Sequence, residues 1–157
     1  MKKKGSIMSP TLIKTAIETL KSMTDLTSKV IDAGDPEKYA KSVEQLHSGV
    51  EESFDLMRKL VNEDQSLSTD EKLERLKKIA AEEQAAKEKC GAALEGHREK
   101  TAKIALDVLK GFLTCGISFT PAIVKSLKQS LSGKESVPTL DADALIASAE
   151  LQETTEQ

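Results

Sequence analysis

Aromatic residues are scarce in this chain of 157 residues, which has no tryptophan, one tyrosine and three phenylalanines. Its core must therefore be built mainly from Leu, Ile, Val, Ala and Met, which favours helices over β-sheets. The length fits one domain, and a domain of this size buries roughly 70% of the surface exposed in the unfolded chain. We therefore expect an all-α fold with a single core.

Cysteine is also rare, and Cys90 and Cys115 are too few for a disulfide scaffold and lack a C-x-x-C spacing. We expect free thiols and a cytoplasmic location. Basic residues open the chain, but Lys14, Glu18 and Lys21 interrupt the apolar region that a secretion signal needs, so none is predicted.

A charge field of one sign is missing as well, since the net charge is −3 and acidic and basic residues are interspersed. Such a surface does not hold a phosphate backbone, so no nucleic-acid partner is expected. Long apolar runs are absent too. The uncharged run 111–124 has fourteen residues between Lys110 and Lys125, whereas a membrane-spanning helix needs about 20.

Helix signals, in contrast, are plentiful. Ser9-Pro10, Asp35-Pro36 and Thr120-Pro121 each place a capping side chain before a proline, and Ser68 with Glu71 forms a capping box. Gly34 and Gly133 are expected as left-handed stops. The signals predict an elongated antiparallel bundle of three long helices and a short fourth, with short linkers at 34–35 and 65–68. We expect a basic leader at 1–8, the bundle at 9–133, and an acidic, disordered tail at 134–157 with a short helix near 141–151.

Apolar residues recur every three or four positions in the first two helices, which predicts coiled-coil-like packing with contacts on more than one side. The predicted core positions are Ile13, Ala16, Leu20, Met23, Thr27 and Val30 in the first helix, and Tyr39, Val43, Leu46, Val50, Ser53, Met57 and Leu60 in the second.

The third helix is harder to interpret. From 70 to 114 it would span roughly 65 to 70 Å, against about 40 Å for the second, so it either overhangs the bundle or breaks near Gly91 and Gly96. Its apolar rhythm runs through Leu73, Leu76, Ala80, Glu83, Lys87, Cys90, Leu94, His97, Thr101, Ile104 and Val108. Four of its alanines, at 85, 86, 92 and 93, either admit a close neighbour or lie on a solvated face, and we expect the solvated face.

Candidate chemistry is sparse. Glu44 and His47 have the E-x-x-H spacing of di-iron bundles, but the second such motif is missing. Cys90 and His97 lie about 10 Å apart on a straight helix, too far for one zinc ion. Cys115 followed by Gly116 invites a nucleophile hypothesis, but a buried thiol is expected instead. We predict no catalytic site, metal or cofactor.

The apolar run therefore carries the main functional hypothesis. Burying one of its large side chains is worth roughly 1.5 to 3 kcal/mol, so something must cover them. We expect the run to fold back onto the bundle, and any part left open to bind a protein partner, a second copy or, third, a membrane surface. The predicted partner- or membrane-binding residues are Phe112, Leu113, Ile117, Phe119, Ile123 and Val124.

The predicted function is a non-enzymatic protein interaction module, such as an adaptor, an inhibitor or immunity-type protein, or a homo-oligomer. The alternative is a membrane-active helical protein that uses segment 104–124.

Overall fold

The computed structural model describes residues 10–117, 119–132 and 146–147, and all the elements in this part of the chain are helical. They are α1 (Pro10–Asp32), α2 (Pro36–Glu63), α3 (Thr69–Leu94), the 3₁₀ segment η1 (Arg98–Lys103), α4 (Ile104–Thr114) and α5 (Pro121–Ser132). The prediction of an all-α fold is confirmed. The predicted count of helices is wrong, because the expected third helix is divided into α3 and α4.

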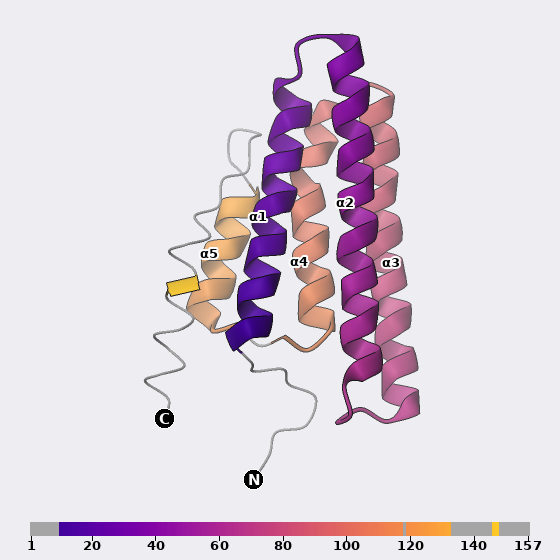
Figure 1. Cartoon of the computed structure of the whole chain (residues 1–157), viewed down its shortest axis with the longest axis vertical. Coiled ribbons are helices and arrows are strands. Elements are labelled where there is room, and N and C mark those ends of the chain that lie inside the picture. The colour runs from indigo at the N-terminus through magenta and orange to yellow at the C-terminus, as the bar shows by residue number, and fades with distance from the viewer. Residues whose placement is uncertain (1–9, 118, 133–145, 148–157) are drawn as a thin grey trace.

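Four helical segments surround one core (Figure 1). Consecutive segments run in opposite directions, and contacts join α1 to α2, α2 to α3, α3 to α4, and α4 back to α1. The η1 segment continues α4 and also contacts α1 and α3. Helix α5 packs on α4 and η1 outside this ring. The short linkers correctly predicted that the first three helices are antiparallel neighbours.

The predicted capping residues Asp35, Ser68 and Thr120 form the expected bonds, while Ser9 lies outside the described residues. The Asp35 side chain accepts a hydrogen bond from the Lys38 amide at 2.8 Å, and Ser68 and Glu71 make both bonds of the capping box. Thr120 Oγ1 accepts from the Ile123 amide at 3.3 Å at the start of α5. Gly34 is not the predicted left-handed stop, since only Gly96 and Gly116 have positive φ among the described glycines.

Gly96 ends α3. Its φ of 100° lets the chain reverse, while its amide donates to Ala93 O and the His97 amide donates to Ala92 O. This pair of bonds is the Schellman motif, which satisfies carbonyls at a helix end. Gly91 stays inside α3. The break leaves α3 about 39 Å long beside an α2 of about 42 Å, so of the two alternatives the structure has the break near Gly96 and not the overhang.

Gly116 repeats the same device at the end of α4, with a φ of 93° and bonds from Gly116 N to Leu113 O and from Ile117 N to Phe112 O. The chain then turns into α5, whose Ile123 and Leu127 are buried against the bundle. The predicted fold-back of the apolar run is therefore confirmed.

The core confirms the apolar pattern of the first two helices. All six predicted positions of α1 are buried, and five of the seven in α2 are buried while Tyr39 and Leu60 are partly buried. Coiled-coil geometry itself stays a prediction.

The pattern predicted for the third helix is confirmed only in part: Cys90, Thr101, Ile104 and Val108 are buried, but most of its positions within α3 are not. Leu73 and Leu94 are 53% and 63% exposed, and the buried positions are Ile79, Ala86, Cys90 and Ala93. The expected solvated alanine face is also wrong, because Ala86 and Ala93 are fully buried in the core.

Several sequence predictions fall outside the described residues, namely the leader at 1–8, the Gly133 stop and nearly all of the tail. Of the short helix predicted near 141–151, only Ile146 and Ala147 are described; both are helical, and Ile146 packs against the core. Within the described chain no helix has the length and apolar content needed to cross a bilayer.

Candidate functional site

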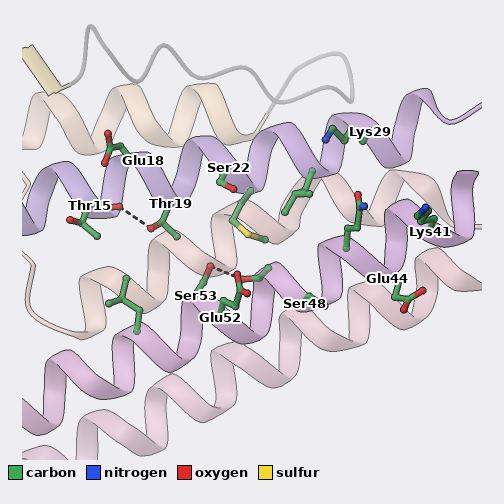
Figure 2. Close-up of a pocket in the computed structure, with 15 residues that line it drawn as sticks. Thr15, Glu18, Thr19, Ser22, Lys29, Lys41, Glu44, Ser48, Glu52 and Ser53 are labelled. Atoms are coloured by element: carbon green, nitrogen blue, oxygen red, sulfur yellow. Dashed lines mark hydrogen bonds between the residues drawn. The ribbon is translucent and has the colours of Figure 1, made fainter.

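The main concave feature among the described residues is an open groove of about 860 Å³ between α1 and α2, which we call the α1–α2 groove. Its lining residues come from these two helices alone (Figure 2). They extend from Thr15 to Lys29 on α1 and from Lys41 to Leu56 on α2. At 1.5 Å per residue each wall is about 21 to 23 Å long, which is the length of about four helical turns.

Apolar atoms and one glycine form the floor of the groove. Met23 is buried, while Leu26 and Leu56 are partly exposed. A Cβ added to Gly49 would lie 2.8 Å from Leu26 Cδ1 and 3.3 Å from Met23 Sδ. Gly49 therefore lets α1 and α2 approach each other closely at mid-groove and leaves no side chain of its own there.

Hydroxyl side chains line the walls, and three of them are already bonded within their own helices. Thr15 donates to Thr11 O, Thr19 to Thr15 O and Ser53 to Gly49 O, each at 2.8 Å. A hydroxyl that donates to the carbonyl four residues earlier needs no further acceptor when it is covered. A partner could therefore bury these walls without leaving their hydroxyl donors unsatisfied.

Charges occupy the two ends of the groove. Figure 2 shows Glu18 toward one end, Glu52 in the same half but nearer the middle, and Lys29, Lys41 and Glu44 toward the other end. All five side chains are exposed, and none of them makes an ion pair in the described part of the chain. These charges are open to a partner.

The contacts of α3 are different, because three of its charged side chains, Glu83, Lys87 and Lys89, form ion pairs with neighbouring helices. Arg58 Nη1 of α2 donates to Glu83 Oε1 at 2.7 Å, and Lys87 Nζ lies 3.6 Å from Glu51 Oε2. Hydrogen bonds to Glu83 and then to Asp55 raise the pKa of the Arg58 guanidinium. Burial has a smaller effect and lowers that pKa.

Further polar bonds join α3 to α4. Lys89 Nζ lies 2.6 Å from Oδ2 of the buried Asp107, and Thr114 Oγ1 donates to Glu82 Oε1 at 3.0 Å. Burial raises the pKa of Glu82, although the bond from Thr114 and the charge of Lys110 oppose that shift. Arg75 Nη1 also donates to Cys115 O at 2.9 Å.

The residues predicted to bind a partner or membrane fall into two groups. Phe112, Ile117 and Ile123 are 0%, 3% and 4% exposed, so the bundle covers them and they offer no binding surface in this structure. Leu113, Phe119 and Val124 are only partly buried and pack at the edge of the core. The predicted surface role is thereby reduced to this second group.

Phe119 and Val124 contribute to a smaller hollow on α5 of about 510 Å³, together with Pro121, Lys125, Lys128 and Gln129. Segment 104–117 supplies the core through Ile104, Val108 and Leu109 as well as Phe112. Membrane insertion of segment 104–124 would therefore require α4 to leave the bundle.

The residues considered for catalysis or metal binding do not assemble. Glu44 is exposed, and His47 lies 3.7 Å from Glu51 instead. His97 is exposed at the start of η1, whereas Cys90 is buried. No group of three or more His, Cys, Asp or Glu side chains that could hold a metal occurs in the described chain.

The two thiols are free and buried, as expected. Burial raises the pKa of Cys90 to about 11 and that of Cys115 to about 12. An activated cysteine nucleophile has a lowered pKa, so the environment of Cys115 is the opposite of the one that the nucleophile hypothesis requires.

The α1–α2 groove was missed by sequence reasoning. Its signal is a set of small polar residues beside the apolar positions of both helices, with Ser22 on α1 and Ser48, Gly49 and Ser53 on α2. Such residues are ordinary on solvated helix faces, so only the pairing of α1 with α2 shows that they lie opposite one another.

Comparison with protein-family models, curated proteins and solved structures found no match to this chain. Functional arguments therefore come from its own residues.

Proposed function

We propose that this chain is a non-enzymatic protein interaction module that receives a helix of its partner in the α1–α2 groove. The module would serve as an adaptor or as an inhibitor of the partner. The observation that supports the proposal is the open groove, with its apolar floor, internally bonded hydroxyls and unpaired charges.

The shape of the groove favours a helix over a small molecule. Small-molecule sites enclose most of their ligand's surface. This groove is open along walls of about 21 to 23 Å, which suits one face of a helix of about four turns. Amphipathic helices commonly bind in such grooves by burying side chains at positions i, i+3, i+4 and i+7.

An arginine at the centre of the groove tests the proposal. Ser22 and Ser48 are exposed, so Ser22→Arg and Ser48→Arg should leave the fold intact while their side chains occupy the space of the incoming helix. Ala81→Arg, on an exposed position of α3, is the matched control. Circular dichroism and thermal melting should be the same for all three variants and the original chain.

The measurement is affinity capture from cells, followed by binding assays with the identified, purified partner. We expect the original chain and Ala81→Arg to bind the partner equally, and the two groove variants to bind at least about tenfold more weakly, which is about 1.4 kcal/mol. If the captured protein is a second copy of this chain, Ser48→Arg should shift the sedimentation of the pure protein to a monomer. Equal binding by all four proteins would contradict the proposal.

A further inference from the structure

We infer that the helix bound in the α1–α2 groove carries basic side chains at the end near Glu18 and Glu52 and an acidic side chain about three turns away, near Lys41. This inference depends on the proposed function and adds the chemistry and direction of the partner. It follows from the arrangement of charges along the groove.

The spacing of these charges is the same on both walls. Glu18 and Lys29 are eleven residues apart on α1, and so are Lys41 and Glu52 on the antiparallel α2. Eleven residues of helix extend about 16 Å. Because the helices are antiparallel, the two carboxylates lie toward the same end and the two ammonium groups toward the other (Figure 2).

The two halves of the groove differ in net charge. The carboxylate end has a formal charge of −2 from Glu18 and Glu52, whereas Glu44 lies among the two lysines and leaves their end with +1. The basic residues of the partner should therefore contribute more to orientation than its acidic residue. Charges at the rim of an interface mainly fix register and association rate, and salt weakens them.

The residues at the centre of the groove indicate which side chain the middle of the bound helix should carry. Ser22 and Ser48 lie near the middle of the groove in Figure 2, and Gly49, next to Ser48 in the sequence, adds no side chain there. A large apolar side chain at the middle of the partner's helix would reach Leu26 and Met23 past them. A second copy that presented this same groove would place small residues against small residues and leave the centre unfilled, so a separate amphipathic helix fits better.

The test uses a synthetic amphipathic peptide of roughly 18 residues, long enough to cover the walls. It has leucines on one face, two lysines in its first turn, two glutamates three turns later, and a nitroxide spin label beside the lysines. Binding to the full chain is measured by NMR, in which the nitroxide broadens the amide signals of nearby residues. A peptide with glutamines in place of all four charges is the control.

We expect the label to broaden signals around Glu18 and Glu52 and to spare those around Lys29 and Lys41. In the charge-swapped chain, Glu18→Lys, Glu52→Lys, Lys29→Glu and Lys41→Glu, the broadening should move to the opposite end. The neutral peptide should bind about threefold to tenfold more weakly in low salt and equally in 0.5 M salt.

The outcomes separate the two proposals. Binding in the groove with the same label position in the original and swapped chains overturns the charge inference and leaves the groove as a helix site. Absence of any groove shift with either peptide overturns the groove as a helix site and, with it, this inference. Shifts around Phe119 and Val124 alone would also overturn both and would assign the binding surface to α5.

Discussion

Helix α2 meets a neighbour along each of two sides, and the two contacts are built differently. Toward α3, ion pairs close the contact, with Arg58 on Glu83 and Lys87 on Glu51. Toward α1, no ion pair joins the helices in the described residues, and the contact combines a buried apolar row with Gly49. Ion pairs therefore bridge the contact of α2 with α3, whereas the contact of α2 with α1 leaves an open groove lined by charged residues.

The difference shows how the same residue types can have two roles in one bundle. Charged residues occur on α1, α2 and α3, but among the described residues every ion pair that joins two different helices involves α3, whereas pairs such as Lys21–Asp25 lie within one helix. Breaking the largely buried pair of Lys89 and Asp107 leaves a buried charge and is costly, whereas an unpaired surface charge costs little. We therefore expect substitutions toward α3 to affect stability and substitutions in the groove to affect binding.

Thiol labelling should show the largest contrast. Cys115 is buried with a pKa of about 12, so a thiol reagent reaches it only when the bundle opens. A cysteine introduced by Ser48→Cys would lie in the open groove. At pH 8 we expect the Ser48→Cys thiol to react at least about a thousandfold faster than Cys90 or Cys115.

The labelling experiment monitors mass increase with a maleimide in water and in urea. In urea above the unfolding midpoint all three thiols should react at similar rates. Fast labelling of Cys115 in the native state would show that the core opens readily at the end of α4. It would contradict the expectation that the contacts of α3 and α4 are more stable than the groove.

The second contrast concerns charge removal. Lys89→Met leaves the Asp107 carboxylate, which is 6% exposed, without its ammonium partner. Removing one member of a largely buried pair is strongly destabilising, and with Lys89 partly exposed we expect a loss of about 2 kcal/mol in urea denaturation.

Lys41→Met is the matched change in the groove, and we expect its effect to be within about 0.5 kcal/mol. The double variant Lys89→Met with Asp107→Asn should recover part of the loss, because it removes the unpaired charge. Equal losses of stability for Lys89→Met and Lys41→Met would contradict the proposed difference between the contacts of α3 and the α1–α2 groove.

The caps and the first two helices were predictable because their signals are local. Asp35, Ser68 and Thr120 bond to amides three residues away, so the sequence alone specifies them. The core positions of α1 and α2 were predictable for a related reason, since apolar residues recur there with helical spacing and most of them are buried.

The pattern of α3 was not predictable from apolar spacing, because α3 makes many of its contacts through charged side chains. Its buried face contains Ile79 and Cys90 with two alanines, while Glu83, Lys87 and Lys89 bond to other helices. The sequence placed a possible helix break near Gly91 and Gly96. The structure shows that the helix ends just before Gly96, where the amides of Gly96 and His97 bond to the last carbonyls of α3.

The groove was beyond sequence reasoning for a further reason. The apolar run 111–124 was expected to fold back onto the bundle and largely does so, while the open groove lies among residues that are typical of a solvated helix face. Which polar face stays open depends on which helices pack together, and that information is nonlocal.

Three glycines give the next contrast, of about 1 to 2 kcal/mol. A Cβ at Gly111 of α4 would lie 2.4 Å from Sδ of the fully buried Met57 and 3.0 Å from Phe54. The overpacking cost exceeds the gain of about 1 kcal/mol from replacing a helical glycine, so Gly111→Ala should destabilise by about 1 to 2 kcal/mol.

In the groove, Gly49→Ala meets Leu26 Cδ1, the end of a partly exposed side chain that can rotate away. Its effect on unfolding should lie within about 0.5 kcal/mol, although a partner's helix should bind more weakly. Gly91→Ala has no atom within 4 Å and should stabilise by about 0.5 to 1 kcal/mol. Thermal melting of the three variants gives the order of their stabilities. A larger loss of stability for Gly49→Ala than for Gly111→Ala would contradict the expected difference between the groove and the core.

The smallest effect is a pH dependence on the α3 side. Burial raises the folded-state pKa of Glu82 above its ordinary value of 4.5. A carboxyl group with a raised pKa contributes stability that is fully present below 4.5 and is lost as the pH rises through the folded-state value. Glu82→Gln keeps an acceptor for the Thr114 hydroxyl, which lies 3.0 Å from Glu82 Oε1, and removes the charge.

We therefore expect Glu82→Gln to raise the free energy of unfolding at pH 7 by less than about 1 kcal/mol, because Glu82 is only partly buried and solvent screens its charge. The gain should disappear below pH 4, where the original carboxyl is protonated. Urea titrations of the Glu82→Gln variant and the original chain at pH 3.5, 5.5 and 7 measure the gain, and a gain that persists at pH 3.5 would mean that its cause is packing at the α3–α4 contact and not the buried charge.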